Sequence, residues 1–434
     1  MARIFLATMP ITGHVRPALP VARELANAGN EVLWYCGRLF EPHITRTGAR
    51  FVPSNVALKS IDSKGDVLQN LEGRKAGISG FKKVILELFI ESIPAYSKEV
   101  DPLIDDFRPD VIVADHSFAV APMIATQRQI KMVMFAISPV HVSSVDTAPF
   151  GTGLLPSSSP IGHLRNRSLQ WIMTNVIFRD IQRALRHSCA EIGFPPLDGL
   201  FMDWGIQLAD RYLATTIPEF EYTRSDLPQV VEFVGPMLPT GVDDWTPPSW
   251  WRDLEEARAD GRPVILVTQG TATSDPAHLI LPAISALANE TALVIATTDR
   301  VTPDDVLPAK QRPANLRLEQ FVPFTELLPQ VDLMVTNGGY GGVQMALAYG
   351  VPLVVAGNSE DKMEVNTRVK WSGAGASLNT SKPKPAKLRA AALKVLNDPS
   401  YHSRALELKA AYAHYSGAQQ AAKIILDAAT ALDS

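Results

Sequence analysis

The chain has 434 residues, of which 46% are hydrophobic and 20% are charged, and its formal net charge is −4. This composition is that of a soluble globular protein, and the length predicts two domains of roughly 200 residues each. The slightly acidic balance excludes the broad basic face that nucleic-acid binding usually requires.

Cysteine use and hydropathy point to a cytoplasmic protein. Cys36 and Cys189 provide neither a disulfide framework nor the spacing of a metal site. The apolar run Ile4–Met9 is too short for a signal peptide. No window approaches the roughly 20 apolar residues of a spanning helix, so we expect no integral membrane segment. A monomer and a homodimer both remain open.

The first fifty residues predict a β-α-β unit with a histidine at its edge. A strand at Arg3–Ala7 leads into a loop with His14, a helix follows, and a second strand is expected at Glu31–Cys36. In such a unit the loop after a strand faces the ligand crevice. A histidine titrates near neutrality, so His14 is a plausible general base.

A polar loop and a long helix are expected next. Residues 60–80 are typical of a mobile loop, and Phe81–Phe107 is predicted as one helix with a kink at Pro94. Its lysines leave contact with a membrane surface open, but packing on the sheet is the favoured interpretation.

The strand Val111–Ala114 is followed by Asp115, the best carboxylate partner for His14. A carboxylate on one ring nitrogen would hold the tautomer and stabilise the imidazolium. Asp115 could instead cap the helix expected near Ala119, and the two roles are compatible.

The stretch between residues 139 and 163 is a long loop rich in Ser and Pro. Structureless loops of this length inside a domain usually have a binding role. The following helix, Leu164–Ile192, carries Trp171 and Phe178 as core or pocket-lining residues. Further strands are predicted at Tyr212–Thr215 and Val230–Val234. The residues expected to line an apolar acceptor pocket are Phe118, His141, Phe150 and Leu154–Leu155.

The domain boundary is predicted at the proline-rich stretch 236–250. This divides an acceptor-binding domain, 1–235, from a donor-binding domain, 251–415, and residues 416–434 form a helix that could pack back on the first domain. Strand-helix alternation on both sides predicts two doubly wound α/β domains that face each other across a cleft.

A glycine-rich turn marks the second domain. Leu333–Thr336 and Pro352–Ala356 are strand signals, and between them four glycines in five positions, 338–342, precede a helix. Backbone N–H groups at a helix start attract anions, so a phosphate or diphosphate is the expected guest. Asp361 and Lys362 follow the second strand and should share that rim.

Four motifs in order give the chain a family resemblance: Pro10 to His14 in P-x-x-G-H-x-x-P, Gly270-Thr271, Phe321-Val322-Pro323, and the turn from Asn337 that is followed by Asp361. The chain resembles inverting nucleotide-sugar glycosyltransferases of the GT-B fold, a family that glycosylates secondary metabolites and includes macrolide glycosyltransferases. The resemblance implies His14 as base, Asp115 as its support, and a nucleotide sugar, UDP-glucose, as a co-substrate rather than a cofactor. The acceptor implied is a small hydrophobic or aromatic molecule such as a polyketide, macrolide or flavonoid. The residues implied at the donor are Gly13, Gly270, Thr271, Phe321, Val322, Asn337, Gly339, Gly341, Gly342, Val343, Asp361 and Lys362.

The chain departs from that family at four donor sites. Asn337 stands where a histidine is common, and Gly342-Val343 where a Ser/Thr pair usually follows. Met345 stands where a glutamate often meets the ribose, and Lys362 where a glutamine reads the sugar. Lys362 could restore the positive charge that Asn337 lacks.

Other readings stay open. A nucleotide-sugar epimerase and a non-catalytic metabolite carrier would fit two facing α/β domains, whereas a nicotinamide oxidoreductase is disfavoured by the missing GxGxxG. No DxD or His/Cys cluster is present in the sequence, so no metal is expected.

Overall fold

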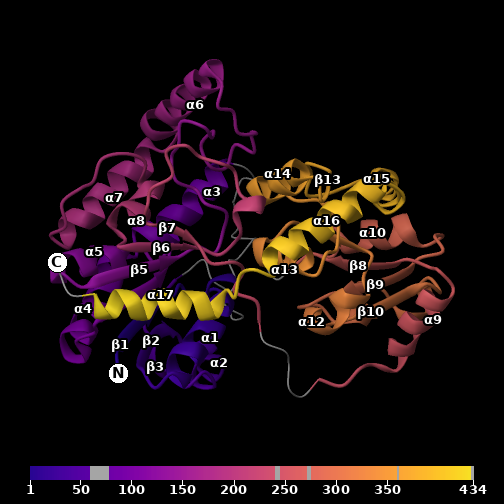
Figure 1. The fold of residues 1–434 in the computed structure, drawn as a ribbon, viewed down its shortest axis with the longest axis horizontal. Helices are drawn as coiled ribbons and strands as arrows, with labels where there is room; N and C mark the ends of the chain where they lie inside the picture. The colour runs from indigo at the N-terminus through magenta and orange to yellow at the C-terminus, as the bar shows by residue number, and fades with distance from the viewer. Residues whose placement is uncertain (59–77, 240–244, 271–274, 359–360, 432–434) are drawn as a thin grey trace. The chain divides into compact units, whose positions relative to one another are not determined.

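The computed structural model describes residues 1–58, 78–239, 245–270, 275–358 and 361–431. The chain divides into two compact units, Met1–Pro239 with Tyr415–Ser434, and Thr240–His414. Each unit is built on its own parallel sheet (Figure 1). Most of the loop expected at 60–80 lies outside the described residues.

The first unit contains a seven-stranded parallel sheet in the order β3-β2-β1-β4-β5-β6-β7. Ala7 at the end of β1 is level with Tyr35 on one side and Ala114 on the other, so the carboxyl ends of these strands share one edge. The strands are β1 (Arg3–Ala7), β2 (Glu31–Gly37), β3 (Arg50–Ser54), β4 (Val111–Asp115), β5 (Lys131–Phe135), β6 (Arg211–Ala214) and β7 (Val231–Phe233).

Side chains that alternate along each strand build a core on each face of this sheet. Phe5 and Ala7 belong to the core on one face, whereas Ile4 and Leu6 belong to the core on the other. Burial on both faces explains why these strands are continuous apolar runs in the sequence. The helices of the unit are α1 (Thr12–Asn27), α2 (Glu41–Thr45), α3 (Ile78–Ile85), α4 (Ile93–Phe107), α5 (Val120–Arg128), α6 (Pro160–Ile172), α7 (Arg179–Glu191), α8 (Trp204–Leu208) and α17 (Ala418–Thr430).

Both long helices that the sequence predicts are interrupted. A π-helical turn, η2 (Leu86–Ile90), separates α3 from α4, and Pro94 lies in the first turn of α4 rather than at a kink. A second one, η3 (Met173–Ile177), separates α6 from α7. Helical periodicity survives an inserted residue, so the pattern alone does not reveal these breaks.

One predicted helix packs as expected, whereas the other exposes a side chain that was expected to be covered. α4 packs into the core, as expected, and Tyr96 and Val100 are buried there. Trp171 on α6 is not a core residue, since 63% of it is exposed, whereas Phe178 is buried.

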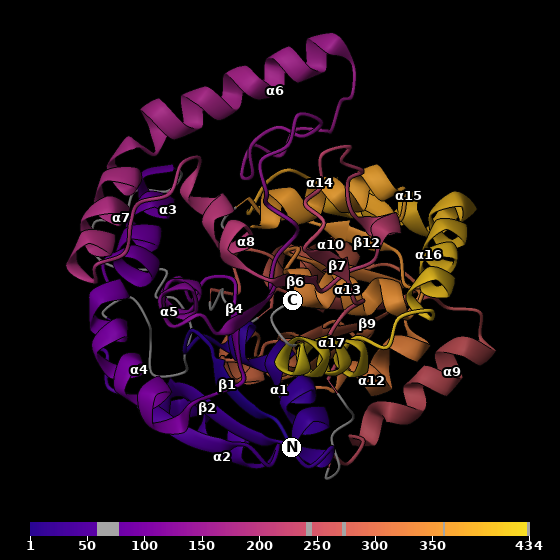
Figure 2. The same cartoon turned by 60° about the vertical axis from the view of Figure 1, so that its left-hand side comes forward.

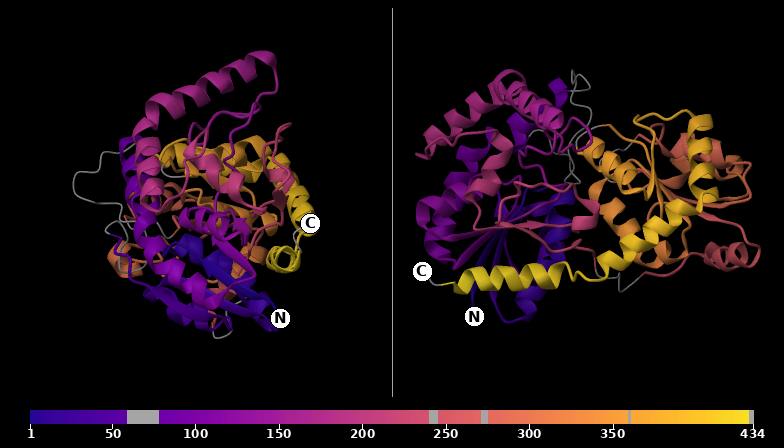
Figure 3. Two further views of the ribbon diagram at one scale, coloured as in Figure 1. Left: turned by 90° about the vertical axis from the view of Figure 1, so that its left-hand side faces the viewer. Right: turned by 45° about the horizontal axis from the view of Figure 1, so that its top comes forward.

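The C-terminal helix α17 belongs to the first unit. It runs along the sheet (Figures 1 and 3), and its small buried side chains Ala421 and Ala422 permit a close approach to the core that α1 also covers. Gln420 Nε2 donates to the Phe233 carbonyl at 3.3 Å.

The second unit contains a six-stranded parallel sheet in the order β10-β9-β8-β11-β12-β13. Helices α10 and α15 contribute to the core on one face, and the Tyr412 hydroxyl on α16 donates to Gln344 on α13. The strands are β8 (Val264–Thr268), β9 (Leu293–Thr297), β10 (Leu316–Glu319), β11 (Leu333–Thr336), β12 (Leu353–Val355) and β13 (Gly375–Ser377). The helices are α9 (Asp253–Ala259), α10 (Ile280–Leu287), α11 (Pro303–Val306), α12 (Phe324–Leu327), α13 (Tyr340–Ala348), α14 (Lys362–Ser372), α15 (Pro385–Asn397) and α16 (Pro399–Tyr412).

None of the helices in the described part of the chain combines the length and apolarity that crossing a bilayer requires.

Candidate functional site

The first candidate site lies where β1 and β4 end. His14 is in the first turn of α1, which follows β1, and Asp115 is the last residue of β4. Asp115 is fully buried and His14 is 7% exposed. The structure brings the two residues together: His14 Nδ1 lies 2.9 Å from Asp115 Oδ1.

The hydrogen bonds of Asp115 define the state of the histidine ring. Asp115 Oδ2 accepts the Met9 N–H at 2.7 Å, and Oδ1 accepts the Ser117 N–H at 2.9 Å. With Asp115 as a carboxylate, which can only accept, His14 Nδ1 is the donor of their hydrogen bond. The lone pair therefore belongs to Nε2, which has no hydrogen-bond partner among the described residues.

Asp115 does not cap the next helix. α5 begins at Val120, and its N-cap, Ala119, has no side-chain hydrogen bond. The carboxylate is used by the histidine and by two backbone N–H groups that hold it in place.

An apolar wall lies beside His14. The Phe89 ring stacks with the imidazole at a centroid distance of 6.3 Å and an interplanar angle of 28°. Burial raises the pKa of the neighbouring Cys36 thiol to about 12, and its Sγ accepts a hydrogen bond from Thr8 at 3.3 Å. Cys36 therefore stays protonated at neutral pH and does not act as a thiolate. The sequence offered Phe89 only as one apolar position of a helix.

A second histidine cluster follows Asp115 directly. His116 Nδ1 lies 2.9 Å from the Tyr212 hydroxyl, and the His116 and His141 rings meet edge to face at 4.7 Å. Burial lowers the pKa of His141 to about 4, and burial together with the other histidines lowers that of His116 well below its ordinary value. Both rings are neutral at pH 7. The Phe150 ring lies 5.8 Å from His141, so these two predicted acceptor residues form one surface.

Phe118, the third predicted acceptor residue, belongs to the core. It is 1% exposed, and its ring packs 4.8 Å from Tyr96 and 6.0 Å from Tyr35. A side chain enclosed in this way cannot line an open pocket, so we assign it a packing role.

Carboxylates anchor the loop that precedes α6. Glu221 accepts the Val140 N–H at 3.0 Å, and Asp203 accepts the Ser143 N–H at 2.8 Å. Asp226 accepts the Val145 N–H at 2.8 Å. A loop that the sequence predicts to be structureless is therefore held at several points along its backbone.

The second candidate site is the glycine turn between β11 and α13. Gly338 has a φ of +87°, and a Cβ there would overlap Asn366 Oδ1. The next glycine is the N-cap of α13, so Gly341 and Gly342 lie in the first helical turn. Their N–H groups have no carbonyl partner within the helix, because the first turn lacks residues four positions back. This is the geometry of an anion site.

Two of the predicted donor residues are enclosed in the second unit. Val343 is fully buried, and its N–H is used by the Gly339 carbonyl at 3.0 Å. Val322 is 1% exposed, whereas the preceding Phe321 is 53% exposed. Val343 and Val322 are part of the core. Their side chains are enclosed, so only the residues next to them could contact a ligand.

Asn337 joins the ends of β8 and β11. Its Nδ2 donates to the Gln269 carbonyl, and its Oδ1 accepts the Gly339 N–H at 3.3 Å. Gly270, with a φ of +67°, lies against the same amide, and Thr271 is outside the described residues. The amide therefore shapes the turn.

Asp361 and Lys362 open α14. Asp361 is the N-cap, and Lys362 is 4% exposed. A Cβ at Gly357 would lie 3.0 Å from Lys362 Cδ and would overlap the Asn337 carbonyl, so the lysine stem runs close to the end of β11. Gly13, in contrast, lies in the first unit beside His14, where a Cβ would meet nothing within 4 Å.

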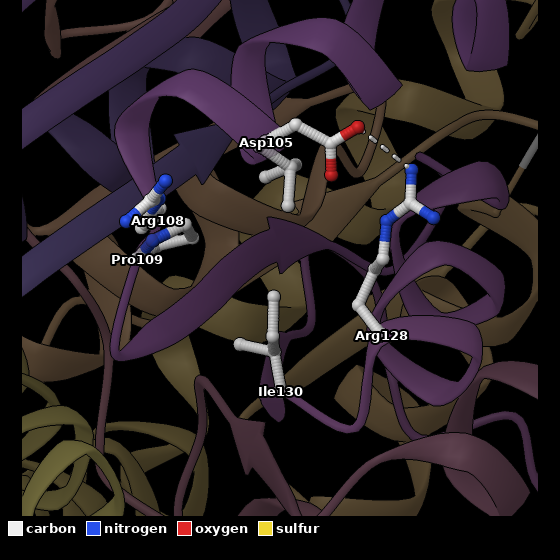
Figure 4. Close-up of a pocket in the computed structure, with 6 residues that line it drawn as sticks. Asp105, Arg108, Pro109, Arg128 and Ile130 are labelled. Carbon is white, nitrogen blue, oxygen red and sulfur yellow. Dashed lines mark hydrogen bonds and ion pairs between the residues drawn. The ribbon is translucent and has the colours of Figure 1, made fainter.

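No group of three His, Cys, Asp or Glu residues in the described part of the chain is placed to hold a metal ion. A hollow between α4 and α5 lies at the amino ends of β4 and β5, at the edge opposite His14 (Figure 4). Its lining residues are Ile104, Asp105, Arg108, Pro109, Arg128 and Ile130.

Known proteins match both units. A family model described as "Erythromycin biosynthesis protein CIII-like, C-terminal domain" matches residues 279–427. The 4'-demethylrebeccamycin synthase of Lentzea aerocolonigenes is 42% identical over 415 residues, covering 95% of this chain and 96% of its own. UDP-glycosyltransferase 2 of Phaeomoniella chlamydospora is 31% identical over 423 residues, covering 94% and 92%. The solved glycotransferase of kitacinnamycin has a TM-score of 0.75 at 21% identity, covering 98% of this chain and 99% of its own.

Proposed function

Because this chain belongs to the secondary-metabolite glycosyltransferases of the GT-B fold, we propose that it transfers glucose from UDP-glucose to a hydroxyl of a small hydrophobic or aromatic acceptor, with inversion at the anomeric carbon. The observation that carries the proposal is the His14–Asp115 pair, with its proton on Nδ1 and its lone pair on Nε2.

The proposed step is a single displacement. Nε2 of His14 takes the proton of the acceptor hydroxyl while that oxygen forms a bond to the anomeric carbon. The bond from this carbon to the diphosphate oxygen breaks, and its electron pair leaves with the diphosphate. Attack from the opposite face turns an α-linked donor into a β-glycoside. The buried Asp115 carboxylate, only 2.9 Å from Nδ1, stabilises the imidazolium that forms.

The donor is assigned to the second unit. The N–H groups of Gly341 and Gly342 at the start of α13 are the proposed diphosphate ligands, and the helix dipole favours the same charge. Phe321 offers an exposed ring on which a nucleobase could stack. One relative is a UDP-glycosyltransferase, which supports UDP as the nucleotide.

The acceptor is assigned to the surface formed by His116, His141 and Phe150 in the first unit. Both histidines are neutral at pH 7 and all three rings are in contact or share a neighbour, which favours an uncharged aromatic guest. An anionic acceptor would find no charge partner in these three side chains.

Mass spectrometry with a set of nucleotide sugars, each with and without an acceptor library, tests the proposal. A transferase consumes donor and yields a glycoside when both partners are present. An epimerase would change the donor alone, and a carrier would change neither. Failure of UDP-glucose with success of another nucleotide sugar would overturn the donor assignment and leave the His14 mechanism to be tested separately.

A further inference from the structure

An apolar strip faces solvent along α6 and η3. We call this strip, together with two leucines of the preceding loop, the α6 ridge. In the first unit α6 stands away from the sheet (Figures 2 and 3). Ile161 is 82% exposed, and Leu164, Trp171 and Val176 are each at least 60% exposed. The members of the ridge are Leu154, Leu155, Ile161, Leu164, Trp171, Ile172 and Val176.

This helix differs from an ordinary surface helix, because much of its apolar surface faces solvent. Two of its polar side chains point inward: buried Asn166 donates to the Val145 carbonyl at 2.8 Å, and Gln170 donates to the Ser144 carbonyl at 2.7 Å. A surface helix usually buries its apolar stripe and exposes its polar face. On α6 much of the apolar surface faces solvent instead, and an exposed patch of this kind marks an interaction surface.

The segment is also basic. Residues 160–187 contain five arginines and one acidic residue, although the chain as a whole has a net charge of −4. The acidic residue, Asp180, is already paired with Lys82 at 2.6 Å. Arg167 and Arg179 are exposed on the same segment.

The geometry points to an anionic lipid bilayer as the partner: we propose that the α6 ridge lies in the headgroup region with its helix axis parallel to the membrane surface. Aliphatic side chains with a tryptophan and flanking arginines are typical of helices that lie in this interface. A second copy of the chain fits less well, because residues 160–176 contain no acidic side chain and two paired ridges would offer no charge partner to their arginines. Because the ridge is convex, a partner protein with a matching groove is not required.

Vesicle flotation with the full-length protein tests this proposal. The protein should bind vesicles that contain phosphatidylglycerol, bind phosphatidylcholine vesicles weakly, and lose affinity as salt is added. Leu164→Glu and Trp171→Glu should each weaken binding by about tenfold or more. Both side chains are exposed, so the variants should fold normally, which a thermal melt checks.

Two controls separate insertion from charge alone. Leu406 on α16 is 45% exposed, so Leu406→Glu adds the same charge at a comparable leucine and should leave binding unchanged. Quenching of tryptophan fluorescence by brominated lipid should disappear in Trp171→Phe while binding persists.

Three results would overturn the proposal. These are no binding to phosphatidylglycerol vesicles at low salt, equal binding by Leu164→Glu and the parent, or light scattering that shows a dimer dissociated by Leu164→Glu. The last result would make the ridge a contact between copies of the chain. None of these outcomes depends on which sugar or acceptor the protein uses.

Discussion

Replacing Asp115 by asparagine tests the proposed base most directly, because it keeps the size of the side chain and removes its charge. The carboxylate accepts N–H groups from His14, Ser117 and Met9 at 2.9, 2.9 and 2.7 Å. An asparagine has one oxygen and one NH₂ group, so at least one of these buried N–H groups loses its acceptor.

The substitution should lower both the folding stability and the catalytic rate. One orphaned buried donor costs about 1–3 kcal/mol of folding free energy. If the NH₂ group faces His14, the ring must accept at Nδ1, its proton moves to Nε2, and the base is lost. If the oxygen faces His14, the base survives but the imidazolium has no negative partner. In the first case we expect kcat for a hydroxyl acceptor to fall by about 10²–10⁴-fold, the range of general-base catalysis, and in the second case by somewhat less.

The assay is steady-state turnover of an alcohol or phenol, with UDP binding followed by calorimetry. His14→Ala should lose a similar factor, and in both variants UDP affinity should be unchanged. An acceptor that is already ionised at the assay pH, such as a thiolate, should lose far less. Asp210→Asn is the matched control, since Asp210 accepts the Met132 N–H at 2.8 Å at the amino end of β5, where no chemistry is proposed. Normal turnover of a hydroxyl acceptor by folded His14→Ala or Asp115→Asn, or an α-glycoside from an α-linked donor, would refute the mechanism.

Three further predictions concern the donor site and acid stability. Activity should survive excess EDTA, because the start of α13 supplies N–H donors to the diphosphate; loss that Mg²⁺ restores would contradict this. Gly341→Val should weaken UDP binding by about 10- to 100-fold, since the Cβ meets open space in the fold but stands where the phosphate would approach. Gly338→Ala should instead lower stability, because its Cβ would overlap Asn366; calorimetry and melting separate the two cases, and unchanged UDP affinity in folded Gly341→Val would rule out the site. The pKa of His141 is lowered to about 4, so between pH 6.5 and 4 the unfolded chain binds a proton that the folded chain does not. Stability should therefore fall as pH falls through this window, by up to about 3 kcal/mol; His141→Gln should flatten the urea-melt profile, exposed His187→Gln should not, and equal profiles would contradict the argument.

Much of the fold was predictable from sequence because parallel strands buried on both faces are short, continuous apolar runs. β1, β2, β4 and β11 are found within one residue of their predicted bounds. The partnership of His14 and Asp115 was also predictable, although 101 residues separate them. Both follow neighbouring strands at their carboxyl ends, and the parallel fold brings such positions to one edge.

The interruptions of helices were not predictable from periodicity. η2 and η3 each add a residue to a turn, which leaves the apolar pattern nearly intact on either side. The start of α6 was easier to predict. Ser159 accepts the Gly162 N–H at 3.1 Å and Pro160 is the first residue of the helix, and a serine N-cap followed by proline is a known helix start signal.

Exposure was decided by tertiary structure, because it depends on which distant segments cover a residue. Phe118 was expected at an acceptor, yet Tyr35 and Tyr96 enclose it. Trp171 was expected in a core or pocket, yet the inward bonds of Asn166 to the preceding loop turn it to solvent. The sequence by itself determined the strands, the edge where the chemistry lies and the residue types that meet there, since these depend on local pattern and parallel topology. Which side chains are enclosed and which are presented was decided only by contacts between segments far apart in the chain.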